Sequence, residues 1–457
     1  MKRDLPLYNV LKERNDAGTI RFHMPGHKGK PIPASVLSTS CAIDFTELYG
    51  TGNLYDGVYP IFDAEDRCAS AWGCENAFFL TGGATMGIHT MLSLVRMRTG
   101  KVLVDRGSHK SVYNALGLLD LEPVYIYPEF DKKHGIATAY TTDAVSAALE
   151  KDEEIGAFIL TSPTYYGICT DIEKIAEVCH ERGVLLLVDE AHGAHFPFIS
   201  GKGSAVSRGA DLAVCSLHKT LPALGQAALL TAGKTFRDYE IRQKMSIFGT
   251  SSPSYQIMAS IDLARDYMEN EGREVCKKHI EKIHEIRDII NKRGIFTALD
   301  FPDGDPLRLC VMTSGAGISG YVAARILEDE YKVVCEMADE RQVLFIITPA
   351  DTEEELDILL NSIIALEERR GEAISAETVS HKAPCVKLSP HEVMKRECER
   401  IMLKNAGGRI AAANISPYPP GIPVIAMGEV IEDEFLPYLY HNGFDDEDLI
   451  LVIKEDT

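Results

Sequence analysis

Two apolar segments of this 457-residue sequence end in side chains that can do chemistry. The segment VLLLV (184–188) runs into Asp189, and LAVCS (212–216) is followed closely by His218 and Lys219. A carboxylate at the end of a buried strand is costly unless it meets a cation or a strong hydrogen-bond donor. A partly buried lysine can lose its proton and become a nucleophile. The sequence therefore predicts a buried carboxylate at Asp189 and a reactive amine at Lys219.

Two other turns offer an anion site and an aromatic ring. The segment FFL (78–80) leads into TGGAT (81–85), which opens a predicted helix. Backbone N–H groups, hydroxyls and the helix dipole favour an anion there. The alternative is a plain tight turn, and the lysine of a P-loop is missing. The segment KVLVD (101–105) leads to His109, which could cover a ligand or could only cap a helix or face solvent.

The elements that carry these residues have the pattern of a mainly parallel sheet. Short β-rich segments that are apolar throughout are typical of strands buried on both faces. Predicted helices near 84–98, 112–119 and 171–182 separate them. The predicted strands lie at 78–83, 101–106, 157–163, 184–192, 211–219 and 227–233. In such sheets ligands bind at the carboxyl ends of the strands, which is where the reactive residues fall.

Together these strand ends supply what pyridoxal 5'-phosphate needs from a protein. A lysine forms a Schiff base with it, and a carboxylate pairs with its pyridinium nitrogen. An anion site holds its phosphate, and a flat ring covers its face. Each element alone is unspecific, but their order and their placement at strand ends favour a pyridoxal-phosphate enzyme.

At this point the sequence resembles the Orn/Lys/Arg decarboxylase family of fold-type I pyridoxal-phosphate enzymes. The matching motifs run in family order over nearly the whole chain. They are FHMPGHKG (22–29), DFTEL (44–48), TGGAT (81–85), DRGSHKSV (105–112), TSPTYYG (161–167), VDEAHGAHF (188–196), SLHKTLPALGQ (216–226), TSSPSY (250–255) and YPPGIP (418–423). The N-terminal wing domain of the large family members is absent, so their assembly into large rings is not expected here.

The resemblance implies roles for individual residues. Lys219 would carry the cofactor as a Schiff base, with Asp189 at its pyridinium nitrogen. His109 would stack on one face of the ring, and Ala191 would pack on the other. His192 would lie near the imine or, alternatively, would only orient Asp189. The phosphate would be surrounded by Ala84, Thr85, Ser216 and His218.

The resemblance also implies a homodimer with shared active sites. Thr250 and Ser251 match positions that reach the cofactor phosphate of the neighbouring subunit, although they could instead only cap the helix that follows. Lys219 or His218 would return a proton to Cα after carbon dioxide leaves. The expected catalytic residues are therefore Lys219, His218 and His192.

The expected fold class is α/β, with an aspartate aminotransferase-like large domain. We predict an N-terminal arm over 1–63, a cofactor-binding large domain over 64–270, a small α/β domain over 271–380 and a C-terminal α+β domain over 381–457. A long helical stretch is expected over 253–293. Strands are expected at 308–313, 332–337 and 342–348, and helices at 319–330, 352–370 and 390–404.

The expected reaction is decarboxylation of a basic amino acid. Short family members favour L-arginine, giving agmatine and carbon dioxide for polyamine biosynthesis. Lysine and ornithine remain alternatives because the side-chain pocket cannot be read from the sequence. Aminotransfer and aldol cleavage use the same cofactor residues, so only the decarboxylase-like motifs argue against them.

Composition limits the other classes of function. The 47 Lys and Arg against 68 Asp and Glu give a formal net charge of -21, which argues against a general nucleic-acid binder. That charge is compatible with a cationic substrate without establishing one. Eleven Cys without a CxxC pair indicate reduced thiols. With no signal-peptide pattern and no long apolar run, we expect a soluble cytoplasmic protein without a membrane partner.

Two motifs point elsewhere and are set aside. GAGISG (315–320), followed by Glu336, has the GxGxxG spacing of a dinucleotide site, but it lies late in the chain and away from the reactive residues. His192 and His195 could form a metal pair, but the sequence offers no third ligand at a useful spacing. We therefore expect neither a nicotinamide cofactor nor a metal.

Overall fold

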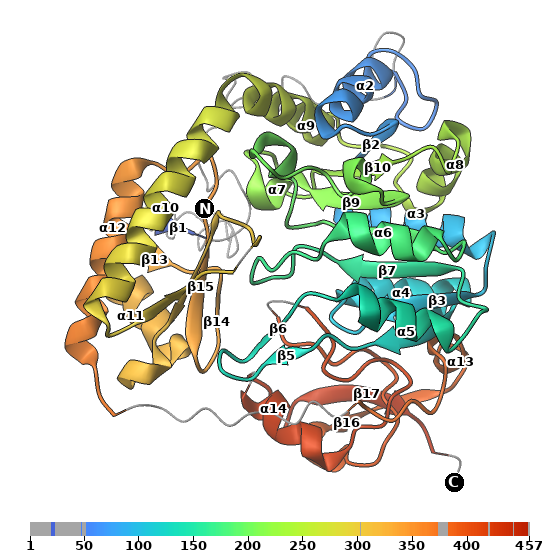
Figure 1. Cartoon of the computed structure of the whole chain (residues 1–457). Helices are drawn as coiled ribbons and strands as arrows, with labels where there is room; N and C mark the ends of the chain where they lie inside the picture. The colour runs from blue at the N-terminus through green and yellow to red at the C-terminus, as the bar shows by residue number, and fades with distance from the viewer. Residues whose placement is uncertain are drawn as a thin grey trace, which may run out of the picture.

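The computed structural model describes residues 20–22, 47, 52–301, 303–372, 383–418, 421–441 and 443–455. Apart from Phe22 and Glu47, the motifs FHMPGHKG and DFTEL lie outside these residues. The described chain forms a large body around a seven-stranded sheet, a small body around a four-stranded sheet and a C-terminal segment below the large body (Figure 1).

The seven-stranded sheet is the predicted mainly parallel sheet. Its spatial order is β2-β10-β9-β8-β7-β3-β4, and β10 alone runs antiparallel to its neighbours. Its strands are β2 (Asn76–Leu80), β3 (Lys101–Asp105), β4 (Glu122–Ile126), β7 (Ala157–Thr161), β8 (Leu185–Asp189), β9 (Leu212–Ser216) and β10 (Ala228–Ala232). This mainly parallel sheet, with helices between its strands, agrees with the α/β fold class predicted from the sequence.

Both faces of this sheet are covered, which explains why its strands are apolar throughout. In β7, Ala157 and Ile159 enter the core under α3, α4 and α8. Their neighbours Phe158 and Leu160 enter the core under α5 and α6. The helices are α3 (Gly83–Arg96), α4 (Lys110–Leu119), α5 (Thr142–Glu150), α6 (Ile172–His180) and α8 (Asp238–Phe248). Alternate residues of one strand therefore serve two cores.

A long helical run joins the large and small bodies. It consists of α9 (Tyr255–Tyr267), a π-helical turn (Met268–Gly272) and α10 (Arg273–Arg293), and it agrees with the stretch predicted over 253–293. One hydrophobic core continues across it, since Leu217 and Phe79 of the large body share a cluster with Leu309 and Phe345 of the small body. The helix α2 (Ile61–Trp72) packs on α9 in the same region.

The small body has an antiparallel sheet in the order β11-β12-β15-β14. Its strands are β11 (Thr297–Leu299), β12 (Arg308–Met312), β14 (Met337–Ala338) and β15 (Gln342–Ile346), and its further helices are α11 (Gly320–Tyr331) and α12 (Glu353–Ala365). The single strand predicted over 332–337 is wrong. The chain bends there, because β13 (Val333–Val334) pairs with β1 (Ile20–Arg21) whereas β14 pairs with β15.

The C-terminal segment corrects a second prediction. The helix predicted over 390–404 ends after one turn, α13 (Pro390–Val393), and β16 (Cys398–Met402) follows it. β16 pairs antiparallel with β17 (Leu449–Ile453), and α14 (Leu436–His441) precedes β17. The side chains of β16 alternate between exposed and half-buried, which is the period of a strand. Cross-strand pairing thus overrides the helix-forming tendency of its charged residues.

The remaining features concern boundaries and membranes. The boundary predicted near 270 falls inside the π-helical turn of a continuous helical run, and the one near 380 lies outside the described residues, so both remain predictions. Two short strands, β5 (Phe130–Asp131) and β6 (Ile136–Ala137), form a separate hairpin. Within the described chain, we find no helix with the length and apolar character that a bilayer crossing requires.

A buried ion pair fastens the C-terminal segment to the large body, and we predict that it is needed for stability. Arg106, directly after β3, contacts Glu429 at 2.9 Å and donates to the carbonyls of Pro423 and Val424. Glu429 is 1% exposed. Because Glu429→Ala leaves a buried guanidinium without its counter-charge, we expect a loss of about 3 kcal/mol in the free energy of unfolding, measured by urea denaturation.

The matched control is Glu399→Ala. Glu399 also pairs with an arginine, Arg409, at 2.7 Å, but its side chain is 42% exposed. Its removal should change the free energy of unfolding by less than about 1 kcal/mol. Equal losses in the two variants would show that burial of the Arg106–Glu429 pair does not matter.

Candidate active site

Lys219 lies on a short helix, α7 (Leu217–Thr220), directly after β9. In Figure 1, α7 lies on the side of the large body that faces the small body. The Lys219 Nζ is 3.1 Å from His192 Nε2. Burial lowers the pKa of Lys219, the negative charges of Asp189 and Glu336 oppose that shift, and Arg308 adds to it. The amine therefore loses its proton more easily than an exposed lysine would.

Asp189 is the last residue of β8 and is 3% exposed. Its Oδ1 accepts a hydrogen bond of 3.1 Å from the backbone N–H of Ala191, which is itself buried. Burial raises the pKa of Asp189, and the charge of Lys219 opposes the shift. A buried carboxylate of this kind would be stabilised by a cationic N–H partner.

His109 is both a helix cap and a neutral flat ring. It is the N-cap of α4, where its Nδ1 accepts from the backbone N–H of Ser111. Burial, followed by the charges of Lys219 and Lys110, lowers its pKa to about 4. The opposite edge of the ring faces Gly421, where an added Cβ would lie 3.1 Å from His109 Cδ2. Of the motif YPPGIP, Pro419 and Pro420 lie outside the described residues.

His192 lies between Lys219 and Arg308 rather than against Asp189. Its Nε2 faces Lys219, and its Nδ1 is 3.0 Å from Arg308 Nη2. Its ring packs on Tyr165, with centroids 4.8 Å apart. Both ring nitrogens are thus engaged elsewhere, which disfavours the alternative that His192 only orients Asp189.

The predicted anion site lies at the start of α3. Gly83 has a φ of +69° and donates to the carbonyl of Gln226, in the loop after α7, so this turn lies beside the lysine segment. Ala84 is half-buried and Thr85 is exposed. The buried hydroxyl of Thr81 has no hydrogen-bond partner among the described residues. Such a turn presents N–H groups and a hydroxyl to an anion.

Two residues predicted at the phosphate flank Lys219. Ser216 is buried at the end of β9, and its N–H donates to the carbonyl of Ala191. His218 is half-buried, and its Nδ1 lies 3.0 Å from the carbonyl of Ala227. A carbonyl only accepts, so the Nδ1 of His218 carries a proton.

Thr250 and Ser251 lie in the exposed connection between α8 and α9. The alternative that they cap α9 is wrong, because its N-cap is Ser254, which accepts from the N–H of Ile257. Thr250 Oγ1 accepts from the N–H of Ser252, and its carbonyl accepts from Tyr55. Their reach into a second subunit stays a prediction.

The sequence reasoning missed three residues of the site. Arg308 begins β12 and is buried, Tyr165 packs on His192, and the Tyr165 hydroxyl donates to Glu336. Arg308 could have been found from the sequence, since a charged residue at the start of an apolar strand needs a buried partner just as Asp189 does at the end of one. Glu336 lies at the bend of the chain between β13 and β14, and this bend brings it to the Tyr165 hydroxyl.

The two motifs set aside have structural explanations. In GAGISG, Gly320 begins α11 so close to β15 that a Cβ would lie 2.0 Å from the carbonyl of Gln342. His195, the second histidine of HGAH, bonds to Asp305 at 2.9 Å, whereas His192 faces Lys219 and Arg308. Among the residues that the structure describes, no group of three potential ligands could hold a metal ion.

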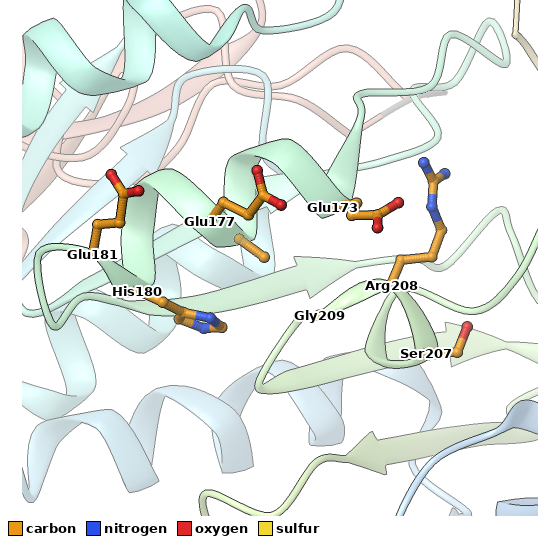
Figure 2. Close-up of a pocket in the computed structure, with 8 residues that line it drawn as sticks. Glu173, Glu177, His180, Glu181, Ser207, Arg208 and Gly209 are labelled. Atoms are coloured by element: carbon orange, nitrogen blue, oxygen red, sulfur yellow. The ribbon is translucent and has the colours of Figure 1, made fainter.

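A surface hollow on α6 contains none of these residues (Figure 2). It encloses about 670 Å³ and is lined by Glu173, Glu177, Glu181, His180 and Arg208, among others. The glutamates are exposed and follow one side of the helix. Its lining is that of a solvated surface rather than of an enclosed ligand site.

The clustered residues fit pyridoxal phosphate. Lys219 has a lowered pKa, Asp189 is a buried carboxylate, and His109 is a neutral ring within electrostatic reach of Lys219. The hydroxyl of Thr81 and the first N–H groups of α3 suit a phosphate. These residues follow four different strands of one sheet, at the carboxyl ends where ligands of such sheets bind.

Comparison with known proteins indicates the family of this chain. Residues 5–303 match the family model "Orn/Lys/Arg decarboxylase, major domain", and residues 373–443 match "Orn/Lys/Arg decarboxylase, C-terminal domain". An arginine decarboxylase of Bacillus anthracis is 31% identical over 96% of this chain and 93% of its own length. That of Bacillus subtilis (strain 168) is 29% identical over 96% and 94%.

Among solved structures, lysine decarboxylase A from Pseudomonas aeruginosa superposes with a TM-score of 0.77 and 20% identity, covering 98% of this chain and 80% of that one. At this identity the likeness shows the fold alone. The match to the family models extends over most of the chain, including the segment that carries Lys219. The chain therefore belongs to the Orn/Lys/Arg decarboxylase family of pyridoxal-phosphate-dependent enzymes.

Proposed function

We propose that this protein decarboxylates L-arginine to agmatine and carbon dioxide, as a step of polyamine biosynthesis. The observation that carries the reaction is the half-buried Lys219 of lowered pKa, set among Asp189, His109 and His192. The choice of arginine is supported by full-length relatives of about 30% identity that are named arginine decarboxylases. Lysine and ornithine are the alternative substrates.

In this proposal the site residues hold the cofactor in four ways. Lys219 carries it covalently, Asp189 pairs with its ring nitrogen, and His109 and Ala191 cover its two faces. Its phosphate lies among Ala84, Thr85, Ser216 and His218. When bound, pyridoxal phosphate supplies a conjugated ring that takes up the electron pair released as Cα loses its carboxylate.

The chain's own groups bind the substrate and move its proton. Arg308 is a buried guanidinium whose Nη1 faces Asp305 Oδ2 at 3.6 Å and whose Nε has no hydrogen-bond partner among the described residues, so the Nε–H remains as a donor for the α-carboxylate. Glu336 contributes a negative charge near Lys219, which favours a cationic substrate. Lys219, or His218 beside it, returns the proton to Cα.

We further propose that the active unit is a homodimer, with Thr250 and Ser251 reaching the phosphate site of the partner subunit. Large apolar side chains are exposed on α8, the helix that precedes this segment: Ile247 is 63% exposed and Tyr239 is 61% exposed. Tyr59 and Phe62, at the start of α2, are exposed as well. Exposed apolar surface of this kind favours burial against another chain.

The proposal is tested by the products of three basic amino acids. With pyridoxal phosphate and excess arginine, lysine or ornithine, we expect carbon dioxide from each turnover and agmatine as the preferred amine. Mass spectrometry of the amine, together with kcat/KM for each substrate, makes the measurement. A higher kcat/KM for lysine would reassign the substrate. Absence of carbon dioxide with all three, or formation of an oxo acid, would contradict decarboxylation.

A further inference from the structure

Four buried or half-buried residues form a continuous chain of polar contacts from the small body to the reactive lysine. Asp305 Oδ2 lies 3.6 Å from Arg308 Nη1, and Arg308 Nη2 lies 3.0 Å from His192 Nδ1. His192 Nε2 lies 3.1 Å from Lys219 Nζ. Asp305 lies just before β12 and Arg308 is its first residue. His192 follows β8 and Lys219 follows β9, both of the seven-stranded sheet.

The direction of each hydrogen bond follows from the chemistry of its ends. A guanidinium has only N–H donors, so His192 Nδ1 must be the acceptor facing Arg308. A neutral imidazole has one N–H, which must then be on Nε2. An imidazolium is excluded because its Nδ1–H would point at the N–H of Arg308. His192 Nε2 is therefore the donor to Lys219 Nζ, and only an uncharged amine can accept there.

We propose that Arg308 fixes His192 as the Nε2–H tautomer and thereby holds Lys219 as the neutral amine. Arg308 is then a positioning residue for the nucleophile, acting through His192, in addition to its proposed contact with substrate. This inference rests on the proposed role of Lys219 as the residue that carries the cofactor. In this way a residue of the small body, Arg308, sets the protonation state of a lysine in the large body.

Asp305 keeps the guanidinium of Arg308 in place. Asp305 Oδ1 accepts from His195 Nε2 at 2.9 Å and from the N–H of Leu307. Burial would raise the pKa of Asp305, but His195 and Arg308 outweigh it and hold the pKa at about 2. Asp305 is thus a carboxylate at neutral pH and compensates the buried charge of Arg308.

The charges around His192 and Lys219 agree with this assignment. Burial first, with the charge of Arg308 in the same direction, keeps the pKa of His192 well below its usual range, so its ring is neutral. Lys219 faces Asp189 and Glu336, which favour its ammonium form, and Arg308, which disfavours it. An N–H donor at His192 Nε2 also disfavours the ammonium form of Lys219, because it can hydrogen-bond to the neutral amine and not to the ammonium.

The direct test is the tautomer of His192 in the full-length chain freed of cofactor. In protein labelled with ¹⁵N-histidine, two-bond ¹H–¹⁵N correlation spectra distinguish a protonated ring nitrogen from an unprotonated one. His192→Gln identifies the signals. We expect the proton on Nε2 and none on Nδ1 at neutral pH. A proton on Nδ1 in the unaltered chain overturns the proposal, whatever the variants do.

The second test compares Arg308→Met with Arg265→Met. The control also removes a buried guanidinium, but one on α9 that pairs with Asp262 of the same helix and with Glu269 of the π-helical turn. In Arg308→Met we expect the proton to move to His192 Nδ1. The pH profile for the rate at which the cofactor-free chain captures added pyridoxal phosphate should shift by about one unit to higher pH. Arg265→Met should change neither reading.

A shifted profile with an unchanged tautomer would mean that Arg308 acts only through its charge, and the proposal would be wrong. Should Arg308→Met fail to fold, the tautomer of the unaltered chain decides. Neither reading needs a substrate. A failure of the proposed function, seen as absence of carbon dioxide, is therefore distinguishable from a failure of this inference.

Discussion

Replacing Lys219 by alanine should abolish decarboxylation. The variant loses the amine that lies 3.1 Å from His192 and that is proposed to carry the cofactor and to return the proton to Cα. Loss of a nucleophile that acts in covalent catalysis costs on the order of 10⁴-fold or more in kcat. The visible absorbance of the bound cofactor should vanish with it. Borohydride treatment should attach the cofactor to the Lys219 peptide in the unaltered chain only.

Lys174→Ala is the control for this experiment. Lys174 lies on α6, is exposed and pairs with Asp171 on the surface, so its loss should leave both turnover and absorbance unchanged. Thermal unfolding of the Lys219→Ala variant shows whether the fold is kept. Turnover or a visible band that survives in a folded Lys219→Ala variant would refute the assignment of this lysine.

The large sheet could be predicted because its strands are buried on both faces. Segments such as AFILT (157–161) are apolar throughout, and that pattern needs no knowledge of tertiary contacts. The strand β4 was missed for the opposite reason. It pairs only with β3, so it is an edge strand, and its sequence EPVYI is largely half-buried and contains a proline, which edge strands tolerate. The helix wrongly predicted over 390–404 shows the same limit, since pairing with β17 decides the conformation of β16.

The same limit separates the site residues that could be predicted from those that could not. Asp189, His109 and Lys219 could be found because the ends of neighbouring parallel strands meet at one edge of the sheet. Arg308 comes from another sheet, and its contact with His192 depends on how the small body packs on the large one. No spacing in the sequence encodes that approach. The sequence thus named the groups proposed to hold the cofactor, and it did not name the arginine that is proposed to order their protons.

The carboxylate of Asp189 should matter far more than its neighbour. In Asp189→Asn the amide keeps the size of the side chain and can still accept from Ala191, but it removes the negative charge opposite Lys219. Because that charge is proposed to stabilise the protonated ring nitrogen on which electron uptake depends, we expect kcat to fall on the order of 10³-fold. Steady-state kinetics with the preferred basic amino acid, at saturating cofactor, makes the measurement.

Glu190→Gln supplies the matched control for Asp189→Asn, because the two carboxyl groups are adjacent and equally buried. Glu190 accepts from the N–H of Ala205, away from Lys219, and burial raises its pKa to about 8. It is therefore largely protonated at pH 7, and an amide replaces it with little change, so kcat should stay within about twofold.

Above pH 8 the unaltered chain must bury a charge at Glu190 that the glutamine variant lacks. The stability that the protonated form contributes is lost as pH rises from the ordinary carboxyl range through about 8, and Glu190→Gln should be the more stable chain above that window. Equal losses of kcat in both variants would mean that burial of a carboxyl at the end of β8, rather than the charge of Asp189, is what the reaction needs.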